Sequence, residues 1–101
     1  MTKKLKKGNL YLNVKESTGI PINALVRVET ARWKTDYDVV VVNDLYDEDN
    51  FNYRGMEYWA EDDFLANGVF IPIPYPYTKE DIFMIALEHG IDVTVLLENL
   101  K

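Results

Sequence analysis

Apolar and polar residues alternate along the first half of the chain, which is the pattern of half-buried β-strands. Residues 9–14 alternate in this way and are followed by turn residues. Residues 24–32 alternate again, and the β-branched run 37–42 is typical of a central strand that is covered on both faces. Because only a short polar stretch separates the last two segments, we expect residues 24–42 to form a β-hairpin.

The middle of the chain is polar and acidic before its apolar pattern returns. Residues 44–52 predict a loop, and residues 53–59 predict a fourth strand. Residues 62–66 can form one helical turn. The following Asn67 and Gly68 predict its end, because both residue types adopt the left-handed backbone conformation that terminates helices.

The segment 69–77 carries a proline at every second position, Pro72, Pro74 and Pro76. Backbone amides two residues apart in a strand face the same neighbour, so these prolines remove donors from one edge only. We therefore expect a strand at the sheet margin, paired on one side and protected on the other. The alternative is a polyproline segment that serves as the ligand of an aromatic groove. The large apolar residues between the prolines favour the edge strand.

The last quarter of the chain has helical periodicity. Thr78 can cap a helix with an acidic first turn, Gly90 can end it, and a second helix is expected over residues 92–100. The predicted fold class is α+β, with a small antiparallel sheet of four to five strands and a C-terminal two-helix unit packed on it. Residues 1–8 predict a basic flexible N-terminal tail, and residues 9–101 a single α+β domain.

The composition predicts one domain that folds without covalent cross-links. The chain has 101 residues, of which 48% are hydrophobic, and these are spread along its length. It has no cysteine, which excludes disulfides, thiolate nucleophiles and cysteine-ligated metals. The basic N-terminus lacks the apolar segment of a secretory signal, and no apolar run is long enough to span a membrane. We therefore expect a cytoplasmic protein.

No residue pattern marks a catalytic centre. The only histidine, His89, stands at the expected end of a helix, and the only serine, Ser17, stands in a turn sequence. The acidic run 47–50 does not match the ligand spacing of an EF-hand calcium loop, and no glycine-rich phosphate loop is present. We expect no enzyme activity, no catalytic residue, no cofactor and no metal. A small enzyme that uses carboxylates alone is the remaining alternative.

Charge is distributed unevenly along the sequence. Residues 1–34 contain eight basic and two acidic side chains, a net charge of +6, whereas residues 36–63 contain ten acidic and one basic side chain, a net charge of −9. Such asymmetry indicates interaction surfaces rather than a fold. Ten neighbouring carboxylates repel one another unless they are spread in water or a cationic partner compensates them.

Aromatic side chains are interleaved with these carboxylates. If the two gather on one face, the carboxylates can steer a basic protein surface and the rings can anchor it. Spread-out, solvated charge is the alternative. The candidate partner-binding residues are Asp36, Asp38, Asp44, Tyr46, Asp47, Glu48, Asp49, Phe51, Tyr53, Glu57, Tyr58, Trp59, Glu61, Asp62 and Asp63.

These observations predict a small acidic protein-binding module, an inhibitor that occupies a basic, nucleic-acid-binding surface of a partner such as a nucleic-acid enzyme. In composition and size the chain is similar to the small acidic inhibitors that phages and mobile elements make, although no motif carries this likeness. The expected C-terminal helix pair lacks the basic residues of a DNA reader, so we expect no direct nucleic-acid binding and no membrane binding. The alternative is a structural or assembly protein that acts through self-association, and a homo-oligomer stays open.

Overall fold

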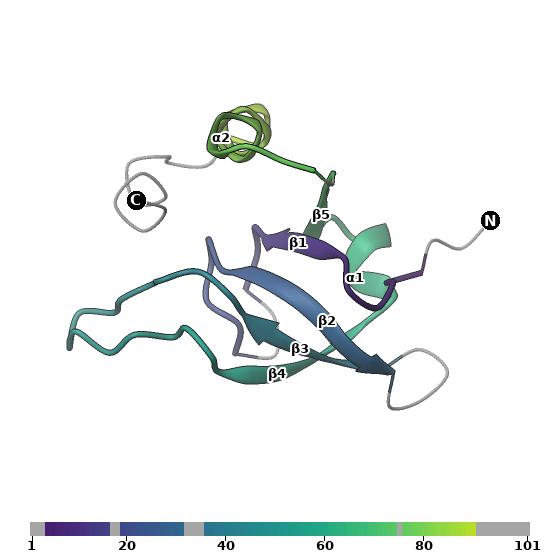
Figure 1. The fold of residues 1–101 in the computed structure, drawn as a ribbon, viewed down its shortest axis with the longest axis horizontal. Coiled ribbons are helices and arrows are strands. Elements are labelled where there is room, and N and C mark those ends of the chain that lie inside the picture. The colour runs from purple at the N-terminus through teal and green to yellow at the C-terminus, as the bar shows by residue number, and fades with distance from the viewer. Residues whose placement is uncertain (1–3, 17–18, 32–35, 75, 91–101) are drawn as a thin grey trace.

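The computed structural model describes residues 4–16, 19–31, 36–74 and 76–90, and these form an antiparallel sheet with two helices (Figure 1). In chain order the elements are β1 (Leu10–Asn13), β2 (Leu25–Ala31), β3 (Asp36–Val41), β4 (Glu57–Glu61), α1 (Asp63–Ala66), β5 (Phe70–Ile73) and α2 (Lys79–Glu88). The five strands are ordered β4-β3-β2-β1-β5, so each of the first four lies beside the next in sequence, and β5 returns to pair with β1. The α+β class is confirmed.

The predicted hairpin over residues 24–42 is confirmed as the pair β2–β3. Its register shifts between Val28 and Thr30, so Glu29 is an extra residue of the kind that bends and twists a strand. This irregularity helps the sheet to curl around its inner face.

The two faces of the sheet carry separate apolar cores. The inner face holds the larger core, which includes Tyr11, Val26, Val39 and Phe70. The outer face holds a smaller core in which Ile82 and Ala86 of α2 contact apolar residues of β1, β2 and β5. Its buried members are Leu12, Leu25, Ile73, Ile82 and Ala86. The helix α2 therefore covers one part of the outer face, and no other helix of the described residues covers the rest.

Strand β3 lies in that remaining part, which corrects the prediction that it is covered on both faces. Tyr37, Val39 and Val41 are buried, whereas the alternate positions Asp36, Asp38 and Val40 are only half-buried. A short apolar run is consistent with a strand that is covered on one face or on both. The pattern does not show how far a helix reaches across the sheet.

The proline-containing strand lies at the sheet margin, as predicted. Among the strands of the described chain β5 pairs with β1 alone, and Ile71 and Ile73 lie opposite Leu12 and Leu10. Pro72 is the strand residue whose missing amide would face away from β1. The other two prolines, Pro74 and Pro76, lie beyond the end of the strand.

Two local predictions hold and one strand is displaced. The helical turn α1 ends before Gly68, which has a φ of +70°, and α2 begins at a reciprocal cap between Thr78 and Asp81. Strand β4 begins four residues later than predicted, because residues 53–56 form a turn in which Gly55 has a φ of +87°. The second predicted helix, 92–100, lies outside the described residues.

Residues 4–8, the described part of the expected flexible tail, pack on the domain. Leu5 is 3% exposed and belongs to the inner core. The backbone amide of Gly8 donates to the carbonyl of Val28 at 2.8 Å, which holds the segment against β2. Within the part of the chain that the structure describes, no helix is both long enough and apolar enough to cross a membrane.

Candidate functional site

The connection between β3 and β4, residues 42–56, is the longest among the described strands and extends from the sheet as an arm (Figure 1). A backbone bridge between Tyr46 and Asn52 holds its two sides together. At the tip, Oδ1 of Asp47 accepts hydrogen bonds from the amides of Asp49 and Phe51, each at 2.9 Å. The carboxylate of Asp47 therefore organises the turn that presents its neighbours.

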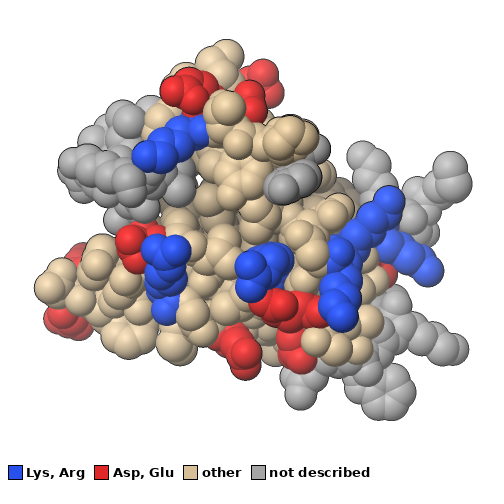
Figure 2. All heavy atoms as spheres, viewed as in Figure 1, with Lys and Arg blue, Asp and Glu red and all other residues tan. Residues whose placement is uncertain are grey.

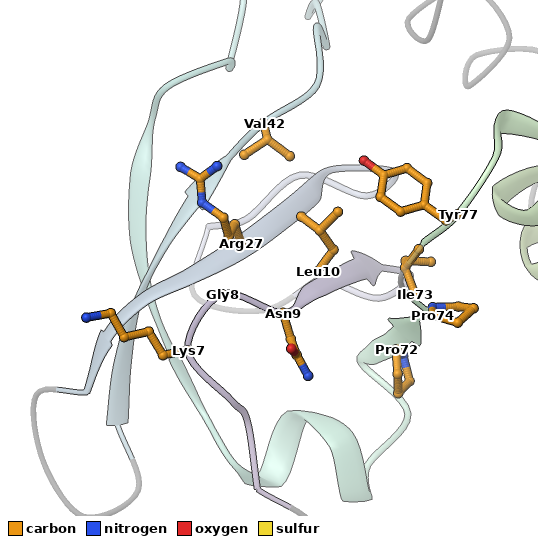
Figure 3. A pocket seen from close by; sticks show the side chains of 10 residues that line it. All are labelled: Lys7, Gly8, Asn9, Leu10, Arg27, Val42, Pro72, Ile73, Pro74 and Tyr77. Atoms are coloured by element: carbon orange, nitrogen blue, oxygen red, sulfur yellow. The ribbon is translucent and has the colours of Figure 1, made fainter.

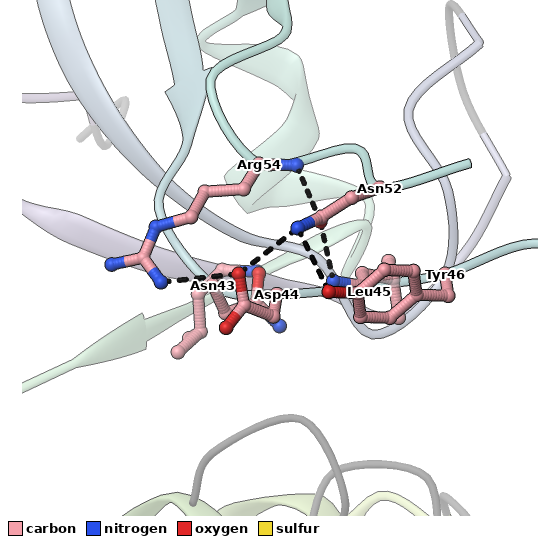
Figure 4. A network of polar contacts seen from close by, with 7 residues as sticks. Asn43, Asp44, Leu45, Tyr46, Asn52 and Arg54 are labelled. Carbon is pink, nitrogen blue, oxygen red and sulfur yellow. Dashed lines mark hydrogen bonds and ion pairs between the residues drawn. The ribbon is translucent and has the colours of Figure 1, made fainter. Parts of the chain in front are cut away.

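A polar network fixes the base of the arm (Figure 4). The side-chain amide of Asn52 and the guanidinium of Arg54 both donate to Oδ1 of Asp44, each at 3.1 Å. The oxygen of Asn52 accepts from the amides of Leu45 and Arg54 at 3.2 and 3.0 Å. The hydrogen bond from Asn52, followed by that from Arg54, lowers the pKa of Asp44 below its usual range. The charge of Asp44 is thus compensated within the arm.

The outer face of β3 and β4 gathers a second group of predicted residues. Cross-strand pairing places Asp36 opposite Glu61, Asp38 opposite Trp59 and Val40 opposite Glu57. A shallow hollow of about 310 Å³ lies there, lined by Asp38, Glu57, Tyr58 and Trp59. The side chain of Tyr58, another predicted partner-binding residue, packs instead against the inner core, and burial, followed by the neighbouring Tyr53, raises its pKa. This arrangement places an indole between carboxylates on one open sheet face.

Asp62 does not belong to this surface, which corrects its place among the partner-binding residues. It is 3% exposed, and its Oδ1 accepts the backbone amide of Leu5 at 2.8 Å. Burial raises the pKa of Tyr37, and the hydrogen bond from its hydroxyl to Asp62 adds to this effect. Asp63, one residue further, is exposed on α1. Of these two adjacent aspartates, Asp62 therefore has a structural role in the interior and Asp63 lies at the surface.

The predicted acidic surface is thus divided between the arm and the sheet face, with one member in the interior. Both parts belong to the β3–β4 hairpin, residues 36–61. This hairpin carries eight carboxylates and one arginine, a net charge of −7. Seven large apolar side chains are exposed among the described residues, and four of them lie on this hairpin: Tyr46, Phe51, Met56 and Trp59. The ring of Phe51 meets that of Tyr53 edge-on, with centroids 5.1 Å apart.

Basic and acidic side chains also mix on the surface. The face drawn in Figure 2 shows lysines and arginines between groups of aspartates and glutamates. Arg27 bonds to Glu29 of the same strand, at 2.7 Å from Nη2 and 3.1 Å from Nε to the same oxygen. Both residues belong to the basic part of the sequence, residues 1–34, so this ion pair compensates charge within that part.

Two parts of this site were not visible in the sequence. Nothing in the pattern marks Asn52 as the centre of the arm's polar network, because its partners are set by the fold of the hairpin. Nothing distinguishes Asp62 from the acidic residues around it, because its amide partner is 57 residues away. In the described part of the chain, no three His, Asp or Glu side chains are grouped so that they could hold a metal ion.

The β3–β4 hairpin is therefore the candidate site, defined by its charge and its exposed rings rather than by a catalytic arrangement. Known proteins offer no guide to its role. Comparison with protein-family models, with curated proteins and with solved structures found no match to this chain.

Proposed function

We propose that this chain is a protein-binding module whose β3–β4 hairpin binds a basic surface on a partner protein. The observation that carries the proposal is the coincidence, on one hairpin, of a net charge of −7 and four exposed large apolar side chains. Protein interfaces use aromatic anchors for affinity and surrounding charges for steering. Exposed rings without such a role cost free energy in water, because apolar surface is better buried.

The arm supports binding because its own hydrogen bonds hold it in shape before a partner arrives. Asp47 closes the tip, and the network around Asn52 fixes the base. A pre-organised binding segment loses less conformational entropy on association than a flexible one. Glu48, Asp49 and Phe51 at the tip are exposed and are thus suited to contact a partner.

The partner that fits best is one whose basic surface ordinarily binds nucleic acid. Same-face positions along β3, such as Asp36 and Asp38, lie about 6.6 Å apart, since a strand rises about 3.3 Å per residue. Rows of carboxylates at this spacing can occupy a groove built for phosphates. Binding would then exclude nucleic acid from the partner, and the module would act as an inhibitor.

Affinity capture from the native cell, with two triple variants of equal charge change, tests the proposal. The hairpin variant is E48Q/D49N/E57Q, which leaves Asp47 and its turn intact. The matched control is E16Q/E80Q/E88Q, which neutralises three exposed carboxylates elsewhere. Three rim charges at about 0.5 kcal/mol each predict about tenfold weaker binding for the hairpin variant.

The expected result is a partner that wild type and control retain, that the hairpin variant loses, and that elution with salt releases. Phe51→Ala should weaken the same complex even at high salt, because it removes an apolar anchor. Nucleic acid should compete with wild type for the captured partner. Equal retention of the partner by both triple variants would refute binding through the hairpin, and failure of nucleic acid to compete would refute the inhibitory role alone.

A further inference from the structure

A groove of about 690 Å³ crosses the outer face of the sheet beside α2 (Figure 3). Its size falls within the range of pockets that hold small molecules, roughly 300–1,000 Å³. Its described lining comes from the segment before β1, from β1, β2 and β5, from the residue after β3 and from the connection between β5 and α2. The lining residues are Lys7, Gly8, Asn9, Leu10, Arg27, Val42, Pro72, Ile73, Pro74 and Tyr77.

The groove exists because α2 stops short of this part of the sheet. Leu10, Val42 and Tyr77 pack against the outer core, yet each is only half-buried. Gly8 has no side chain, and a Cβ placed there would meet no atom within 4 Å. The apolar floor is therefore left open to a ligand.

The charge of the groove is opposite to that of the whole protein. The chain carries 17 carboxylates and a net charge of −6, yet no carboxylate is among the described lining residues, which include Lys7 and Arg27. Glu29 contacts Arg27 through one oxygen that accepts from Nε and Nη2. Because a guanidinium has five N–H donors, Arg27 keeps donors for a further anion.

The arrangement of the groove separates charge from apolar surface. Lys7 and Arg27 stand on one side of Leu10, whereas Ile73, Pro74 and Tyr77 stand on the other (Figure 3). Backbone hydrogen bonds from Gly8 to Val28 and from Val28 to Asn9, at 2.8 and 3.1 Å, hold the Lys7 segment beside β2. The cationic end is thus fixed by the sheet itself.

We propose that this groove binds a small amphiphilic anion, with its carboxylate at Lys7 and Arg27 and its apolar body on Leu10, Val42, Ile73 and the ring of Tyr77. Charge complementarity favours the anion, because Lys7 and the N–H donors of Arg27 that Glu29 leaves unused can bind a carboxylate, whereas a cation would find no carboxylate among the described lining residues. The half-buried floor selects an aliphatic or aromatic body, because a ligand there removes apolar surface from water. The site is independent of binding through the hairpin.

The test uses octanoate as the probe and octan-1-ol as its uncharged analogue, followed by amide chemical shifts in NMR titrations of the full chain. Octanoate should shift the amides of Gly8, Leu10, Ile73 and Tyr77 and bind with a Kd on the order of millimolar, as expected for ten heavy atoms. Octan-1-ol should bind about tenfold more weakly, since it lacks the charge that the two cations contact.

Three variants and one control separate the contributions of the two cations and of the apolar floor to octanoate binding. K7Q should weaken octanoate about threefold, and R27Q/E29Q, which removes a cation and its partner without changing the net charge, should do the same. K4Q is the matched control, because Lys4 is an exposed lysine of the same segment outside the groove, and its Kd should equal that of wild type. V42W should abolish binding by filling the groove while both cations remain.

The proposal is overturned if octanoate leaves these amides unshifted, if octan-1-ol binds as tightly, or if K7Q and R27Q/E29Q bind like K4Q. A variant whose spectrum shows a lost fold is replaced by K7M or R27M/E29M, which keep the apolar stem of each side chain.

Discussion

The buried carboxylate of Asp62 should matter for stability and not for partner binding. The perturbation is Asp62→Ala, which removes an acceptor that lies 2.8 Å from the amide of Leu5 and that also binds the hydroxyl of Tyr37. The side chain makes no capping hydrogen bond to α1, so the loss of a helix cap does not add to the effect. The substitution leaves two buried donors without an acceptor.

Each buried donor left unsatisfied costs roughly 1–3 kcal/mol, so Asp62→Ala, which leaves two, should lower the free energy of unfolding by about 2–6 kcal/mol. This is a large share of the roughly 5–15 kcal/mol that holds a domain of this size together. Asp62→Asn keeps one acceptor oxygen, so its free energy of unfolding should fall by about half as much as that of Asp62→Ala. The matched control is Asp63→Ala at the exposed neighbouring position, where a change within about 0.5 kcal/mol is expected.

Urea unfolding followed by circular dichroism measures these differences. Alkaline titration of tyrosine absorbance supplies a second measurement: in Asp62→Asn the pKa of Tyr37 should fall, because the carboxylate that helps to raise it is gone. Equal unfolding free energies for Asp62→Ala and Asp63→Ala would refute the reasoning, since they would show that the Asp62 contacts contribute nothing.

Three further predictions concern the arm, the sheet margin and a turn. Asn52→Ala and Arg54→Gln should each raise the pKa of Asp44, because Asn52→Ala removes the hydrogen bond that lowers it most and Arg54→Gln removes the arginine's positive charge; NMR titration of the carboxyl carbon measures both. Since that pKa is lowered in the folded state, the network stabilises the arm above about pH 4 and loses this effect as the pH falls through the lowered pKa. Pro72→Val should restore an amide donor on the outer edge of β5 and promote self-association in sedimentation velocity; a monomer at every concentration would contradict this. Gly68→Ala should lower the unfolding free energy by about 1 kcal/mol, because φ is +70° there, and thermal unfolding at an unchanged midpoint would disprove it.

The parts of the fold that could be predicted are those determined by neighbouring residues. The reciprocal cap of Thr78 and Asp81 depends on a spacing of three residues, and the margin position of β5 follows from its proline. The start of β4 could not be placed, because Tyr53 is as apolar and aromatic as a strand residue, yet its carbonyl closes a turn with Met56. Strand propensity does not distinguish a turn from a strand when a glycine later in the segment determines the backbone conformation.

The sequence predicted which stretch of the chain contains the candidate site, but not which of its side chains lie together on the surface. Residues 36–61 do bring carboxylates and rings onto one hairpin, but the structure places Asp62 in the interior and pairs Asp44 with Arg54. Both outcomes depend on contacts made by folding. The groove could not be predicted at all, because Lys7, Arg27 and Tyr77 come to line the same groove only when β1 lies between β2 and β5.

The acidic hairpin and the basic groove lie on neighbouring parts of the sheet. The distance between them determines whether a ligand in the groove changes the binding of a partner at the hairpin. Arg27 lies opposite Val40 on β3, and Val40 lies opposite Glu57 on β4. Adjacent strands are about 4.8 Å apart, so the backbones of Arg27 and Glu57 are separated by about 10 Å. Two unit charges at that distance in water interact by about 0.4 kcal/mol, and physiological salt, with a Debye length of about 8 Å, reduces this to about 0.1 kcal/mol. An anion in the groove therefore changes the affinity of a partner at the hairpin by less than a factor of two, and the two sites can be tested, and can fail, separately.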